Sequence, residues 1–175
     1  MGIVTAAVAA YLVGCVPLAR LTNHLTQGRP WAPWASLAAD ALKGVLAILV
    51  FAPVGTVGQA LTVAAVVAGD QWPALGRETG RSGLTVCVAA ITALTPVTIV
   101  VWGLAWGIGF VISGYRSVAR LVGAALLPLL LGLATGWPLG LAALPACIMV
   151  LERQRGSLKR MLRGQEAKHH WRVEA

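Results

Sequence analysis

A polar segment, residues 69–83, separates two long apolar runs and carries side chains that can bind an anion. Arg77 and Arg81 supply positive charge, and the closely spaced Gly80 and Gly83 let backbone N–H groups approach a ligand. This combination suits a phosphate group. The alternative is an ordinary glycine-bearing loop between two membrane helices.

The elements that hold this segment are apolar. The chain of 175 residues is 58% hydrophobic and 11% charged, with a mean hydropathy of +0.77, whereas soluble domains are about 25% charged. The composition therefore predicts an integral membrane protein. The three cysteines lie inside apolar runs, which favours core packing over a metal site. The net charge of +8 is interpreted as orientation in the membrane and contact with anionic lipids, and not as nucleic-acid binding.

The apolar runs predict an all-α, polytopic membrane domain over residues 1–151 and a basic, amphipathic cytoplasmic tail over residues 152–175. One run, residues 84–113, carries no charge and would be about 45 Å long as a single helix, against a hydrocarbon core of about 30 Å. It forms either one steeply tilted helix or two short helices broken at Pro96. Crossing twice places every Lys- or Arg-bearing turn on one side, as the positive-inside rule demands. We therefore expect seven transmembrane helices, some short or broken, with the N-terminus outside and the C-terminus in the cytoplasm. The expected spans are 2–19, 35–53, 54–69, the two halves of 84–113, 117–135 and 137–151, and residues 20–34 are expected to be a loop.

Two ionisable residues lie inside the second expected span. Asp40 and Lys43 are three residues apart, so they share a helix face and can pair. Charges within a span indicate a functional site, although a neutralised pair near the membrane surface is an equal alternative. Both residues start on the inner side, as do the polar segment and Arg116, so one pocket facing the cytoplasm could collect them. Arg116 and Arg120 share a helix face and could point into the same pocket, although simple flanking of a span explains them as well.

Five stretches carry a resemblance in order along the chain. They are Tyr11-Leu-Val-Gly-Cys-Val-Pro17, Asp40-Ala-Leu-Lys-Gly44, the polar segment, Ser113-Gly-Tyr-Arg-Ser117 and residues 157–166. Together they resemble motifs of the PlsY family, the acyl-phosphate:glycerol-3-phosphate acyltransferases. The resemblance implies a multi-pass protein of the bacterial plasma membrane that makes lysophosphatidic acid for phospholipid synthesis. It implies acyl-phosphate and glycerol 3-phosphate as substrates, with no metal or other cofactor.

The same resemblance suggests site residues. Asp70 stands where the family has a histidine, and Ser82 where it has the lysine of Gly-Gly-Lys-Gly. These two are the candidate catalytic positions, with Asp70 as a replacement base. The candidate substrate-binding residues are Lys43, Arg77, Gly80, Arg81, Gly83, Arg116, Ser117 and Arg160.

The chain also departs from the family pattern. The family's glycine- and asparagine-rich loop should precede Asp40, yet only eleven residues run from Gly28 to Ala38, without that motif. The departure supports an alternative function: a catalytically degenerate homologue that keeps the fold and acts as a lipid-binding or regulatory membrane protein. A small transporter is a third hypothesis, but no paired half-repeats support it.

Overall fold

The computed structural model describes residues 2–26, 29–51, 55–74 and 83–163. These residues form eight helical elements and no strand. In chain order the elements are α1 (Ile3–Cys15), α2 (Leu18–Leu25), α3 (Ala32–Phe51), α4 (Thr56–Gln71), α5 (Leu84–Leu94), α6 (Val97–Ser113), α7 (Arg116–Thr135) and α8 (Trp137–Leu162). The all-α fold expected from the sequence is confirmed.

The first span is broken. α1 ends at Cys15 and α2 begins at Leu18, because Pro17 has no N–H to continue the backbone ladder. The expectation of a loop over residues 20–34 is therefore wrong over most of its length: α2 extends to Leu25 and α3 begins at Ala32. Counted as one span, residues Ile3–Leu25 leave seven helical segments in the described part of the chain, the number expected from the sequence.

The long apolar run divides where Pro96 predicted. α5 ends at Leu94, and α6 begins at Val97 with Pro96 as its N-cap. Among the described residues, three stretches are long and apolar enough to cross a bilayer by themselves: Ile3–Leu25, Ala32–Phe51 and Arg116–Thr135. α5, with 11 residues, and α6, with 17, are shorter apolar helices, so the packing of the bundle must compensate for their length.

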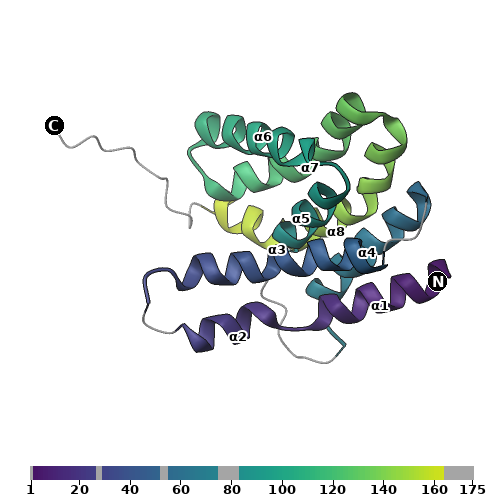
Figure 1. The fold of residues 1–175 in the computed structure, drawn as a ribbon. Helices are drawn as coiled ribbons and strands as arrows, with labels where there is room; N and C mark the ends of the chain where they lie inside the picture. The colour runs from purple at the N-terminus through teal and green to yellow at the C-terminus, as the bar shows by residue number, and fades with distance from the viewer. Residues whose placement is uncertain (1, 27–28, 52–54, 75–82, 164–175) are drawn as a thin grey trace.

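The helices pack as two groups (Figure 1). α3 packs against α1, α2, α4 and α5, whereas α7 packs against α6 and α8. The groups are joined mainly where α4 meets α8 and where α5 meets α6 and α8. The shared core comes mainly from α4, α5, α7 and α8, with smaller contributions from α1 and α3, and includes Val66, Ile91, Leu127 and Val150.

Charged and uncharged turns lie at opposite ends of the bundle (Figure 1). In that view α3 and α7 begin and α8 ends on the left, and the chain has Arg29 just before α3, Arg116 as the first residue of α7, and Lys159 and Arg160 near the end of α8. The N-terminus and the turn between α7 and α8 lie on the right in that view, and the residue of that turn, Gly136, is neither Lys nor Arg. This distribution agrees with the charge argument that favoured two crossings in residues 84–113.

α8 is the longest element in the described chain, with 26 residues. It passes through the expected boundary at residues 151 and 152 without a break and continues to Leu162. The basic segment is therefore helical up to that residue and continuous with the last span. Its position along the cytoplasmic leaflet stays a prediction, and residues 164–175 lie outside the described part.

Candidate active site

A buried lysine joins three helices. The Lys43 Nζ donates to Asp70 Oδ1 at 2.5 Å, to the Val16 carbonyl oxygen at 3.1 Å and to the Gly14 carbonyl oxygen at 3.3 Å. Asp40 Oδ1, one turn earlier on α3, lies 3.9 Å from the same nitrogen. Lys43 is only 2% exposed, which argues against the alternative of a neutralised pair near the membrane surface.

The contacts of Lys43 test two roles expected from the sequence, Lys43 as a substrate-binding residue and Asp70 as a base. An ammonium group has three donors, and the three short contacts of Lys43 use all of them. The Asp70 side chain is 3% exposed and holds that ammonium. The arrangement argues against Lys43 as a phosphate ligand and against Asp70 as a base that reaches a substrate.

The close approach of α1 and α4 makes these contacts possible. A Cβ placed on Gly14 would collide with the Val66 carbonyl oxygen and would lie 3.0 Å from the Gly69 Cα. A Cβ placed on Gly69 would collide with the Tyr11 carbonyl oxygen. Small residues let helix backbones touch in membranes, where van der Waals packing drives association. The crossing therefore requires glycine on both helices.

A second contact from α1 fixes the end of α4. The Tyr11 hydroxyl donates to the Trp72 carbonyl oxygen at 2.8 Å. Trp72 is the C-cap of α4 and follows Asp70 by two residues. α4 thus ends between two anchors, one through Asp70 and one through Trp72.

The polar segment returns to the same place at its other end. Gly83 is the N-cap of α5 and has φ of +65° and ψ of 0°, the left-handed conformation that glycine adopts without a steric penalty. A Cβ at this position would lie 2.7 Å from Gln71 Nε2, and Gln71 is fully buried at the end of α4. No side chain caps α5. A helix N-terminus of this kind offers N–H groups and positive potential to an anion.

The remaining expected site residues are not brought into these contacts. Arg116 is exposed at the first position of α7, and Ser117 beside it is buried. Arg160 is exposed on α8 and donates to Ser157 Oγ at 3.1 Å. Arg77, Gly80, Arg81 and Ser82 lie outside the described residues.

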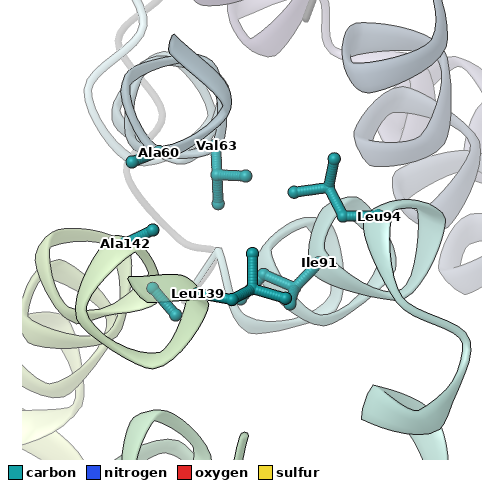
Figure 2. Close-up of a pocket in the computed structure, with 7 residues that line it drawn as sticks. Ala60, Val63, Ile91, Leu94, Leu139 and Ala142 are labelled. Atoms are coloured by element: carbon teal, nitrogen blue, oxygen red, sulfur yellow. The ribbon is translucent and has the colours of Figure 1, made fainter. Parts of the chain in front are cut away.

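The void shown in Figure 2 lies elsewhere and is apolar. It is lined by side chains of α4, α5 and α8, among them Val63, Ile91 and Leu139. Its volume of about 10 Å³ is barely enough for one water molecule, and a lining without polar partners keeps such a void dry. It is therefore a packing defect and not a substrate site. In the described part of the chain, no three His, Cys, Asp or Glu residues gather as metal ligands.

Comparison with known proteins identifies the family. The family model described as glycerol-3-phosphate acyltransferase matches residues 19–164. The chain belongs to the glycerol-3-phosphate acyltransferase family. A glycerol-3-phosphate acyltransferase of Burkholderia pseudomallei (strain K96243) is 30% identical over 195 residues, covering 96% of each chain. One from Neisseria meningitidis serogroup A is 30% identical over 156 residues, covering 84% of this chain and 77% of the relative.

Solved structures agree with this acyltransferase fold. The crystal structure of PlsY, an integral membrane glycerol 3-phosphate acyltransferase, in its lysophosphatidic acid form superposes with a TM-score of 0.78, at 21% identity over 96% of this chain and 95% of that one. Its glycerol 3-phosphate form gives a TM-score of 0.77 at 19% identity, covering 96% of both chains. The chain is accordingly a polytopic membrane protein of this fold, as the apolar runs predicted.

The sequence-based search missed the contacts that build the site. It paired Lys43 with Asp40, whereas the shorter contact is to Asp70, 27 residues away. The sequence did contain a signal for this contact, because ionisable residues of opposite sign near the same membrane face, here Lys43 and Asp70, are expected to form an ion pair. Nothing in the sequence marked Tyr11 or Gln71 as a contact that fixes an end of the polar segment.

Proposed function

We propose that the chain transfers an acyl group from acyl-phosphate to a hydroxyl of glycerol 3-phosphate and so produces lysophosphatidic acid. Membership of the glycerol-3-phosphate acyltransferase family carries this proposal. The bound glycerol 3-phosphate in a PlsY structure of the same fold supports that molecule as the acceptor.

The reaction forms one bond and breaks one. The acceptor oxygen attacks the acyl carbon, and the bond from that carbon to the phosphate oxygen breaks. Inorganic phosphate leaves and takes up the proton that the hydroxyl group loses. Both substrates carry phosphate, so the site must supply positive charge and orient the attacking hydroxyl.

The polar segment is our proposed phosphate cradle. Arg77 and Arg81 supply charge, and the uncapped N-terminus of α5 after Gly83 supplies backbone N–H groups. Gly80 gives the backbone close access to the ligand. Ser82 remains a candidate catalytic position on the grounds of its place in the motif. Arg116, Ser117 and Arg160 are proposed as further substrate contacts that act at the charged end of the bundle.

Orientation and surroundings follow from charge. We propose that the charged end of the bundle faces the cytoplasm of a bacterial cell, which places the C-terminus inside and the N-terminus outside. The end of α8 presents exposed Arg155, Lys159 and Arg160. These side chains suit the anionic lipids of the inner leaflet, each cation contributing about 1 kcal/mol near such a surface.

The test is turnover by the purified protein in a lipid phase supplied with acyl-phosphate and glycerol 3-phosphate. We expect inorganic phosphate and lysophosphatidic acid to appear together above a protein-free control. Arg81→Ala should lower kcat/KM for glycerol 3-phosphate by roughly 10- to 150-fold, the cost of losing a charge-assisted contact of about 1.5–3 kcal/mol.

The matched control is Arg155→Ala, which removes an exposed arginine that pairs with Glu152 at 3.3 Å. It should leave kcat/KM unchanged. A folded wild-type protein without turnover would instead support the degenerate homologue. Equal losses in both variants would show that bulk positive charge, and not the cradle, matters.

A further inference from the structure

We infer that Lys43 and Asp70 form a positioning pair: they touch neither substrate and instead fix the end of α4, where the polar segment begins, relative to α1 and α3. This inference rests on the proposed acyl transfer and assigns roles to two residues within it. It replaces the expectation that Lys43 binds phosphate and Asp70 accepts the proton.

The first argument is the saturation of the ammonium group. Its three donors go to Asp70 and to two carbonyl oxygens of α1, and the side chain is 2% exposed. A phosphate oxygen would have to displace one of these partners. Displacing Asp70 would leave a buried carboxylate without its counter-charge, which is a costly state.

The second argument is what the carbonyl groups need. The break at Pro17 interrupts the helical ladder at the end of α1, and Leu18 N–H bonds to Val16 instead of Gly14. In a bilayer an unsatisfied carbonyl group costs several kcal/mol. Lys43 donates to the Gly14 carbonyl oxygen, which has lost the Leu18 N–H, and gives a second donor to the Val16 carbonyl oxygen, so it stabilises the break.

The third argument is where the pair acts. Asp70 lies in the last turn of α4, directly before the residues at which the polar segment leaves the helix. Tyr11 holds Trp72 from the same end of α1. The segment ends at Gly83, which rests against Gln71, the neighbour of Asp70. Both ends of the proposed cradle are thus fixed at the end of α4, and the ion pair sets the place of that end relative to α1 and α3.

Double substitution separates positioning from direct participation. Lys43→Gln leaves the buried Asp70 carboxylate without its counter-charge, whereas Asp70→Asn leaves Lys43 with Asp40, at 3.9 Å, as its carboxylate partner. Each should lower kcat on the order of 100-fold, as a displacement of about 1 Å does. The combined variant has two neutral amides that can bond to each other, and it should regain at least about tenfold over Lys43→Gln, because the stranded Asp70 charge is gone.

The other roles give opposite results. If Lys43 were a phosphate ligand, the combined variant would stay as inactive as Lys43→Gln, with a raised KM for glycerol 3-phosphate. If Asp70 were the base, Asp70→Asn would abolish turnover and the second substitution would restore nothing. Either result overturns the inference.

A stability effect alone is excluded by a matched control. Val63→Ala removes buried methyl groups from α4 at a residue 2% exposed and far along the helix from Asp70. It should lower Tm while kcat per folded molecule stays unchanged. If Val63→Ala instead lost as much kcat per folded molecule as Asp70→Asn for the same drop in Tm, the loss would be a stability effect and positioning would be contradicted.

A readout without catalysis keeps the inference testable if the proposed transfer fails. Hydrogen–deuterium exchange can be followed in the full-length protein, held in lipid nanodiscs, at the backbone amides of the last turn of α4 and the first turn of α5. We expect exchange there to be at least about tenfold faster in Lys43→Gln than in the wild type, and slowed again in the combined variant. Unchanged exchange rates would overturn the inference whether or not the wild type turns over acyl-phosphate.

Discussion

The contact between α1 and α4 predicts a large effect from a single methyl group. In Gly14→Ala the added Cβ meets the Val66 carbonyl oxygen, and because ordinary contact begins at 3.4 Å, the two helices must separate by about 1 Å. The Val66 oxygen belongs to the backbone, which cannot rotate away as a side chain could. We expect an overpacking cost of about 2 kcal/mol, within the usual range of 1–3 kcal/mol.

This separation has a calculable consequence for the site. The bond from the Tyr11 hydroxyl to Trp72 lengthens from 2.8 Å to about 3.8 Å if the helices part by that amount, which is beyond hydrogen-bond range. The site is then displaced by about 1 Å, which costs on the order of 100-fold in kcat. Thermal unfolding in detergent should show Tm lower by roughly 4–8 °C, at 2–4 °C per kcal/mol for a chain of this length.

Gly103→Ala is the matched control. Gly103 also lies within a membrane helix, but a Cβ there has no heavy atom within 4 Å. Alanine favours helix by up to about 1 kcal/mol over glycine, so Tm should stay the same or rise while kcat is unchanged. Equal behaviour of the two variants, or wild-type activity in Gly14→Ala, would refute the argument from the helix crossing.

Two further substitutions test the ends of the polar segment. Tyr11→Phe removes only the hydroxyl group that holds Trp72. It should lower stability by about 1 kcal/mol, measured by thermal unfolding, and kcat several-fold, measured by phosphate release. An unchanged kcat would mean that this anchor is not needed. Gly83→Ala forces alanine to φ of +65° and places its Cβ 2.7 Å from Gln71 Nε2. It should lower the free energy of unfolding by at least about 1–2 kcal/mol and weaken glycerol 3-phosphate binding, measured by calorimetry. Gly156→Ala, with open space around it, should bind like the wild type.

The fold could be predicted from the sequence because its signals are local. Apolar runs, the break at Pro96 and the one-sided placement of Lys and Arg each follow from the chemistry of the bilayer. The break after Cys15 was harder to predict. Pro17 stands at it, but the short α2 that follows contains Arg20 and reads as a polar loop.

The site was less predictable because its contacts join distant residues. Lys43 bonds to Asp70 and to Gly14, separated by 27 and 29 positions. Which charge pairs with which depends on how α1, α3 and α4 cross, and those crossings depend on backbone approach at glycines. Periodicity along one helix could relate Lys43 only to Asp40, its neighbour on the same face.

The arrangement around Lys43 also has a consequence for how the protein is made. α3 is synthesised before α4, so Lys43 enters the membrane before Asp70 exists. Asp40, 3.9 Å away on the same helix, gives the ammonium a partner during that interval and lowers the cost of inserting a lone charge. We therefore expect Asp40 to act during insertion and Asp70 in the folded protein. Chains truncated after α3 should therefore insert less efficiently with Asp40→Asn than without it, in a translocon glycosylation assay.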